Sequence, residues 1–131
     1  MELSELKAKA KEVAQKAHAP YSNFRVGSAI LTKSGQVYTG CNVENMSYGL
    51  TICAERNAIF SAIAAEGKTQ IEQVVVYTET QRPATPCGAC RQIIYEFCEE
   101  DVKVHSFCDS EKTHDTSIMG LLPDAFNLND Y

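Results

Sequence analysis

The sequence predicts an α/β fold in three layers (α/β/α), with helices on both faces of a mixed central sheet. Segments with apolar residues at helical spacing alternate along the chain with short segments rich in β-branched residues. The run Val74-Val75-Val76 is typical of a strand in the buried middle of such a sheet. The chain has 131 residues without an internal repeat or a linker, so we expect a single domain over residues 1–131.

The first half of the chain begins with a predicted helix and a predicted hairpin. Leucines and alanines recur at helical spacing over residues 3–17, and Pro20 ends that helix. Strands are predicted over 27–32 and 36–42, because Ser34-Gly35 between them suits a tight hairpin turn.

The second half alternates predicted helices with predicted strands. A loop over 45–51 leads into the alanine-rich segment 53–66, which predicts a helix that Gly67 terminates. A strand over 71–78 contains the valine run. The remaining elements are an irregular connection over 81–86, a helix over 87–99, a strand over 102–107 and a short helix over 116–121 that Pro123 stops. The polar segment 110–117 matches no motif.

Composition narrows the classes of partner. The chain is 44% apolar and 22% charged, with a formal net charge of -5, which argues against a nucleic-acid partner but not against a small neutral substrate. No apolar run approaches the roughly 20 residues that cross a bilayer, and the N-terminus lacks the apolar centre of a signal peptide, so we expect no membrane partner. The six cysteines of such a chain are expected to be thiols or metal ligands rather than disulfides. Because free thiols persist in a reducing compartment, we expect the protein in the cytoplasm.

The chemistry of the chain is concentrated in two motifs, Cys53-Ala54-Glu55 and Pro86-Cys87-Gly88-Ala89-Cys90. They supply three thiols and one carboxyl, whereas a structural zinc site usually closes with four protein ligands. Both motifs fall at predicted helix starts, where the positive end of the helix dipole stabilises the thiolates that zinc binds. The spacing therefore predicts a catalytic zinc site held by Cys53, Cys87 and Cys90.

Three thiolates on Zn²⁺ leave a net negative charge, which weakens the ability of the metal to acidify water. Compensating positive charge should therefore lie beside the ligands. Arg56 follows Cys53 by three residues on the same helix face and is the first candidate, with Arg91 as the second. Glu55 is the candidate general acid and base.

Simpler interpretations of the cysteines remain. A Cys-x-x-Cys pair alone is common in redox motifs and in structural zinc sites. A zinc ribbon would need a second such pair, and Cys41, Cys98 and Cys108 do not form one, so we assign them to packing. The three histidines have no ligand spacing, and we place them at the surface or in caps.

Nearly the whole chain resembles the cytidine deaminases, in particular the small homotetrameric type with three cysteine ligands, and zinc deaminases share the spacing of ligands and glutamate. Several motifs carry the resemblance in family order. They are Pro20-Tyr21-Ser22-Asn23-Phe24-Arg25-Val26-Gly27, Gly40-Cys41-Asn42-Val43-Glu44-Asn45, Ser47-Tyr48-Gly49-Leu50, Cys53-Ala54-Glu55-Arg56, Pro86-Cys87-Gly88-Ala89-Cys90-Arg91-Gln92 and Leu121-Leu122-Pro123-Asp124-Ala125-Phe126.

The resemblance implies zinc-dependent hydrolysis of cytidine and 2′-deoxycytidine to uridine and 2′-deoxyuridine, with release of ammonia, in pyrimidine salvage. One zinc ion per subunit would bind Cys53, Cys87 and Cys90. Glu55 would take a proton from water and deliver protons to the ring nitrogen and the departing ammonia.

The resemblance also implies a set of substrate contacts. Asn42 and Glu44 match residues that hold the sugar hydroxyls, and an amide beside a carboxylate can recognise a ribose 3′-hydroxyl as donor and acceptor together. Phe24 matches the aromatic residue that packs against the pyrimidine ring. Ala54, between ligand and glutamate, is assigned to the substrate site as well.

The implied assembly is a homotetramer in which neighbouring subunits complete each pocket. Tyr48 and Phe126 stand at positions that resemble those contributions.

Three alternatives remain open. Deaminases of other cytosine compounds, such as blasticidin S, share the zinc motifs, but the intact block Asn42-Val43-Glu44-Asn45 favours an ordinary nucleoside. Deaminases of polynucleotide bases generally use His as first ligand and need a basic route for the strand, so Cys53 and the acidic balance argue against them. A non-catalytic, zinc-stabilised interaction module would have no use for Glu55 beside an open coordination position.

Overall fold

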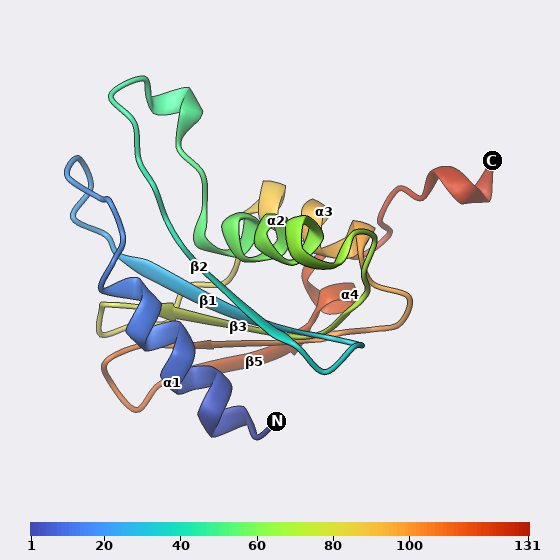
Figure 1. The fold of residues 1–131 in the computed structure, drawn as a ribbon, viewed down its shortest axis with the longest axis horizontal. Coiled ribbons are helices and arrows are strands. Elements are labelled where there is room, and N and C mark those ends of the chain that lie inside the picture. The colour runs from blue at the N-terminus through green and yellow to red at the C-terminus, as the bar shows by residue number, and fades with distance from the viewer.

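A computed structural model describes residues 1–131 and contains one five-stranded sheet between helices (Figure 1). The helices and strands in chain order are α1 (Leu3–Ala14), β1 (Val26–Thr32), β2 (Val37–Cys41), α2 (Ala54–Glu66), β3 (Ile71–Thr78), α3 (Gly88–Glu96), β4 (Lys103–Phe107), β5 (Thr113–Ser117) and α4 (Ile118–Leu121). Two short 3₁₀ helices, η1 (Tyr48–Leu50) and η2 (Leu128–Asp130), lie in the segments after β2 and at the C-terminus.

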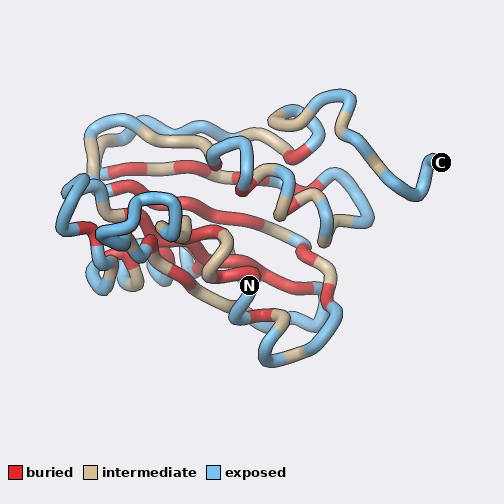
Figure 2. Tube along the Cα trace, turned by 90° about the horizontal axis from the view of Figure 1, so that it is seen from above, coloured by how far each residue is buried: buried red, intermediate tan, exposed pale blue.

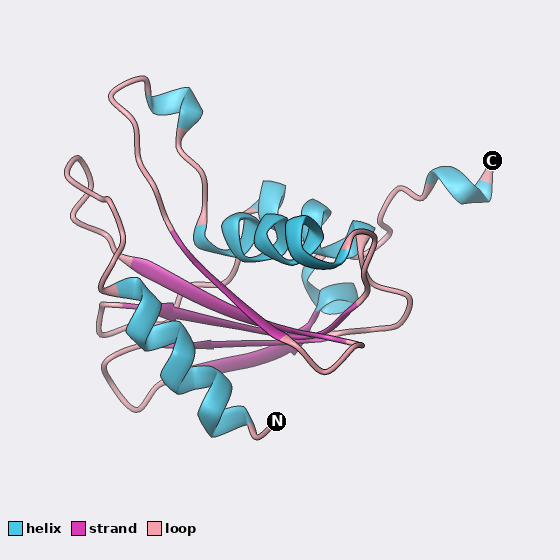
Figure 3. Ribbon diagram, in the orientation of Figure 1, coloured by secondary structure: helices cyan, strands magenta, loops and turns pink.

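The sheet, drawn in magenta in Figure 3, is mixed. Its strand order is β2-β1-β3-β4-β5. The predicted hairpin pairs β1 with β2 antiparallel, and β1 also pairs antiparallel with β3. Strands β3 and β4 are parallel, so the chain must cross over between them, and α3 makes that crossover. Strand β3 is therefore central, which confirms the interpretation of the valine run.

The helices form one layer on each face of the sheet, which confirms the three-layer prediction. On one face, the small residues Ala10 and Ala14 of α1 pack with Ala29, Val75 and Tyr77 of the sheet. On the other face, α2 and α3 cover a larger apolar core; its fully buried members include Ile30, Ile59, Val74, Ile94, Val104 and Ile118. Figure 2 shows the buried residues concentrated in the strands and in the helix faces against them.

Two glycines let the helix backbones approach the sheet closely. A Cβ atom at Gly27 would lie 1.9 Å from the carbonyl oxygen of Ala10 in α1, and one at Gly40 would lie 2.4 Å from the backbone nitrogen of Ala58 in α2. Such distances exclude any side chain. The close packing of α2 on β2 fixes where α2 begins, and its first residues carry the predicted chemistry.

Three of the predicted helices are longer than the helices in the structure. Helix α1 ends at Ala14 rather than at residue 17, and α2 begins after Cys53, which occupies its N-cap position. Helix α3 ends at Glu96 rather than at residue 99, because the carbonyl of Phe97 accepts a hydrogen bond from the backbone N–H of Ile71 (2.8 Å) and is drawn toward β3.

The short helix predicted over 116–121 is wrong in its first two residues, and the prediction missed a strand. Residues Thr113–Ser117 form β5, which pairs antiparallel with β4 at the sheet edge. An edge strand needs backbone pairing on one side only and can expose polar side chains, so its sequence lacks the apolar signal used here. Ser117 ends the strand and caps α4, its hydroxyl accepting from the N–H of Gly120.

Two segments extend away from the body of the molecule, the arm over 43–52 and the C-terminal tail (Figure 1). Both carry exposed apolar side chains, among them Met46, Tyr48 and Leu50 on the arm and Phe126 and Leu128 on the tail. None of the helices has the length and apolar character that a membrane crossing requires.

Candidate active site

The three predicted ligand sulfurs come together at the starts of two helices. Cys53 occupies the N-cap position of α2, Cys87 occupies the N-cap position of α3, and Cys90 lies buried in the first turn of α3. Their Sγ atoms all lie within 4.8 Å of one another, and no other His, Cys, Asp or Glu joins the cluster. All six cysteines are free thiols.

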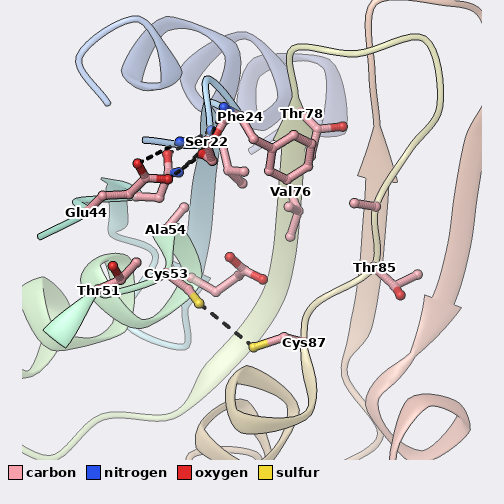
Figure 4. A pocket seen from close by; sticks show the side chains of 14 residues that line it. Ser22, Phe24, Glu44, Thr51, Cys53, Ala54, Val76, Thr78, Thr85 and Cys87 are labelled. Atoms are coloured by element: carbon pink, nitrogen blue, oxygen red, sulfur yellow. Dashed lines mark hydrogen bonds between the residues drawn. The ribbon is translucent and has the colours of Figure 1, made fainter. Parts of the chain in front are cut away.

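The spacing of the sulfurs fits zinc. Two sulfurs each about 2.3 Å from a tetrahedral zinc ion would be roughly 3.8 Å apart. The sulfurs of Cys53 and Cys87 are 3.8 Å apart (Figure 4). Three thiol ligands without a fourth protein ligand match a site that leaves one coordination position free.

Arg56 lies where the sequence predicted compensating charge. Its Nη2 donates to Cys53 Sγ at 3.3 Å, whereas its buried Nε has no partner. Hydrogen bonds from Cys90, and then from Arg56 and Cys87, lower the pKa of Cys53, although burial acts in the opposite direction. A lowered pKa favours the thiolate, which is the form that binds zinc.

Arg91, the second candidate for charge compensation, contacts no sulfur. Its guanidinium donates to the carbonyl oxygens of Pro86 (2.7 Å) and Leu121 (2.9 Å) and to the hydroxyl of Thr85 (2.9 Å). Arg91 therefore anchors the segment that leads into Cys87 to the end of α4.

Glu55 is buried in the first turn of α2, with 4% of its surface exposed. Burial raises the pKa of its carboxyl to about 7. A carboxyl with this pKa can take up and release a proton near neutral pH, as a general acid and base must.

Glu55 and two of the three clustered cysteines, Cys53 and Cys87, line a cavity of about 300 Å³. Figure 4 shows Cys53 and Cys87 at one end of this pocket, Glu44 and Ser22 at another, and the ring of Phe24 beside Val76 and Thr78. The predicted residues Phe24, Asn42, Glu44, Cys53, Ala54, Glu55 and Cys87 all line it.

The polar side chains assigned to the sugar are already engaged with the segment 21–26. The Oδ1 atom of Asn42 accepts from the N–H of Val26 (2.9 Å), and its Nδ2 donates to the carbonyl of Phe24 (2.7 Å). This leaves Asn42 one N–H and one acceptor position for a ligand. Glu44 accepts from the backbone N–H groups of Tyr21 (3.0 Å) and Ser22 (3.2 Å) and from the Ser22 hydroxyl.

Tyr48 and Phe126 do not line the pocket of their own chain. Tyr48 is 74% exposed on the arm and contacts the ring of Tyr21 edge-on, with centroids 5.7 Å apart. Phe126 is 62% exposed on the C-terminal tail.

Sequence reasoning assigned no role to several residues that line the pocket. They are Ser22, Val26, Thr51, Val76, Thr78, Ala84 and Thr85. Val76 carried only a strand signal, because the alternation of a strand does not tell which buried residue faces a cavity. Ser22 lies within a motif quoted above, but no spacing rule distinguishes it from an ordinary turn residue.

Comparisons with known proteins agree with this site. Residues 1–106 match the family model for the cytidine and deoxycytidylate deaminase zinc-binding region. The cytidine deaminase of Sporosarcina psychrophila is 40% identical over 99% of this chain and 95% of its own length, and that of Halalkalibacterium halodurans is 46% identical over 87% and 86%. A crystal structure of cytidine deaminase from Burkholderia pseudomallei superposes with a TM-score of 0.90 at 46% identity and covers 96% of this chain and 100% of that one.

Fold and cluster together define a zinc-binding deaminase domain, with zinc as its metal. The sequence identity of 40–46% to cytidine deaminases, over most of each chain, identifies the family within this class of protein. The chain belongs to the cytidine deaminase family.

The ligand set can be tested by zinc content. Cys90→Ala should lose bound zinc, because two remaining thiolates cannot hold it at this site. Cys98→Ala serves as the matched control: Cys98 lies just beyond the same helix and donates only to the carbonyl of Ile94. Elemental analysis of both purified variants gives the answer, and one zinc per chain in Cys90→Ala would exclude Cys90 as a ligand.

Proposed function

We propose that this protein catalyses the hydrolytic deamination of cytidine and 2′-deoxycytidine to uridine and 2′-deoxyuridine, with release of ammonia. The observation that carries the proposal is a buried carboxyl with a raised pKa, Glu55, in one cavity with Cys53 and Cys87 of a three-thiol cluster that can hold zinc. In this proposal, residues 1–131 form one deaminase domain, Cys53, Cys87 and Cys90 hold one zinc ion per subunit, and the reaction belongs to pyrimidine salvage.

Glu55 is the residue that moves protons. Zinc, when bound, supplies the Lewis acidity that makes water a nucleophile near neutral pH. The Glu55 carboxylate takes one proton from the attacking water and gives it to N3 of the pyrimidine, as the water oxygen bonds to C4. It then moves the second proton to the exocyclic nitrogen, the C4–N bond breaks, and ammonia leaves as the C4 carbonyl forms.

The walls of the cavity suit a nucleoside. Phe24, Val76 and Ala54 supply apolar surface for the flat base, and Asn42 and Glu44 supply polar groups for the sugar. Figure 4 shows Glu44 at the end of the pocket away from the sulfurs. The pKa of Glu44 is held below its ordinary value, first by the Ser22 hydroxyl and then by backbone N–H groups. Glu44 is therefore ionised at neutral pH and accepts a hydrogen bond from a sugar hydroxyl.

Arg56 is the residue that offsets excess thiolate charge in this proposal. Its contact with Cys53 Sγ and its unpartnered Nε support the role. In this proposal, the contact offsets part of the negative charge of three thiolates. Zinc can then still acidify water, although no histidine is among its ligands.

A homotetramer with shared pockets completes the proposal, and the cytoplasm is the compartment that suits six free thiols. The arm with Tyr48 and the tail with Phe126 carry apolar side chains that their own chain leaves uncovered. A neighbouring copy would cover them and bring both residues to a pocket.

The proton-transfer role predicts that Glu55→Gln binds zinc normally and loses the chemical step. We expect kcat for cytidine to fall by about 10²–10⁴-fold, the usual contribution of a positioned acid and base. The assay follows the loss of cytidine absorbance, with zinc measured on the same sample. Glu12→Gln, an exposed change on α1, should have wild-type activity. Wild-type turnover by zinc-loaded Glu55→Gln would refute the role.

The charge role predicts that Arg56→Ala lowers zinc affinity or turnover by about 10–100-fold, the usual effect of losing a group that supports a metal ligand. Competition with a chelator measures the affinity, and the deamination assay measures the turnover. Arg82→Ala removes an exposed arginine as the control. If both quantities stay at wild-type values in Arg56→Ala, the charge role is wrong.

A pocket shared between subunits predicts that activity per chain falls when the protein is diluted until the assembly dissociates, as followed by sedimentation. Coexpressed Phe126→Ala and Glu55→Gln chains should regain activity that neither has alone, because mixed assemblies contain intact pockets. Fully active monomers would contradict the shared pocket.

A further inference from the structure

A hydroxyl–carboxylate contact closes the sugar end of the pocket. The Ser22 hydroxyl donates to Oε2 of Glu44, and both residues line the cavity (Figure 4). The backbone N–H groups of Tyr21 and Ser22 donate to Oε1 of the same carboxylate. Glu44 is thus held at both oxygens by a turn that lies more than 20 residues earlier in the chain.

The hydrogen bonds limit what Glu44 can offer a substrate. An ionised carboxylate has about four acceptor positions, two on each oxygen. Oε1 receives two donors and Oε2 receives one, so Oε2 has the remaining position. The carboxylate is held in one orientation, and a sugar hydroxyl can bond to it without displacing the protein donors.

Ser22 also connects Glu44 to the aromatic wall of the pocket. Its hydroxyl oxygen accepts from the backbone N–H of Phe24 at 3.0 Å. Asn23 between them has a positive φ of 56°, so the turn is tight and brings the two groups to one hydroxyl. The carbonyl of Phe24 in turn accepts from Asn42. One serine side chain therefore links the residue that faces the base with the residue that faces the sugar.

We infer that Ser22 is a positioning residue for substrate recognition: it orients Glu44 toward the sugar 3′-hydroxyl and so sets the preference for substrates that carry this hydroxyl. The inference rests on the proposed function, because it presumes that Glu44 contacts the sugar. Ser22 itself needs no contact with the reacting atoms.

The test compares cytidine with 2′,3′-dideoxycytidine, which lacks the 3′-hydroxyl. Ser22→Ala should raise KM for cytidine about tenfold, as expected for a lost hydrogen bond to a charged group. Its kcat should stay within about twofold, because the bond is present in ground and transition states alike. The kcat/KM for dideoxycytidine should change little, so the preference for cytidine should collapse. A general loosening of the fold would instead lower kcat/KM for both substrates by a similar factor.

Three further variants make the test specific. Ser22→Thr keeps the hydroxyl and should restore the preference for cytidine. Ser22→Cys keeps the size with a weaker donor and should be intermediate, which gives a measurement even if Ser22→Ala does not fold. Ser34→Ala removes a comparable hydroxyl–carboxylate bond, from Ser34 to Glu66 (3.0 Å) at the β1–β2 turn, and should leave the preference unchanged.

The failure of this inference differs from a failure of the proposed function. A wild-type enzyme that does not distinguish the two substrates, or a Glu44→Ala variant with full preference, would remove the sugar role of Glu44 and the inference with it. Wild-type preference in Ser22→Ala and Ser22→Cys, with a normal loss in Glu44→Ala, would overturn the role of Ser22 alone.

Discussion

The chemistry of this protein depends on the packing of two helices whose N-termini meet at one place above the sheet. Helices α2 and α3 share a core through Ile59 and Ile94, and their first residues carry the ligand sulfurs. The unpaired N–H groups and the positive dipole end of each helix favour the thiolates. If either helix shifted, the 3.8 Å separation of the Cys53 and Cys87 sulfurs would be lost and the site could not hold zinc.

Two carboxyls in one cavity are driven to opposite protonation behaviour by their surroundings. Glu55 is buried, and a pKa of about 7 against an ordinary 4.5 corresponds to about 3 kcal/mol against its ionised form. Glu44 faces a turn that offers three donors, and its pKa is lowered. Divergent environments of this kind are how one pocket separates a proton carrier from a fixed anion. In the proposed function, Glu44 binds the substrate and Glu55 moves protons, so two glutamates of one pocket have different roles.

The arm over 43–52 and the C-terminal tail carry several of the apolar side chains that the single chain leaves exposed. Both segments lead away from the sheet (Figure 1), and the tail contacts α3 through a hydrogen bond from Asn127 to the hydroxyl of Tyr95 (3.3 Å). Extended segments such as these make few contacts with the rest of their own chain. In the proposed assembly, a neighbouring subunit would pack against them and they would contribute to its pocket. Substrate recognition would then be divided, with Ser22, Asn42 and Glu44 from one chain and aromatic side chains from another.

The sequence by itself determined the features that depend on local pattern: the order of the helices and of four of the five strands, the buried valine strand, the cysteine and glutamate motifs, and the position of Arg56 one turn from Cys53. It missed β5, because a polar edge strand is defined by backbone pairing with β4 rather than by apolar periodicity. The sequence did not single out Ser22. It also placed Arg91 beside the ligand sulfurs, whereas Arg91 donates to two carbonyls and a hydroxyl. Which hydroxyl meets Glu44, and which carbonyls Arg91 reaches, was decided only by the tertiary structure, because these contacts join segments more than 20 residues apart or depend on where a loop folds back.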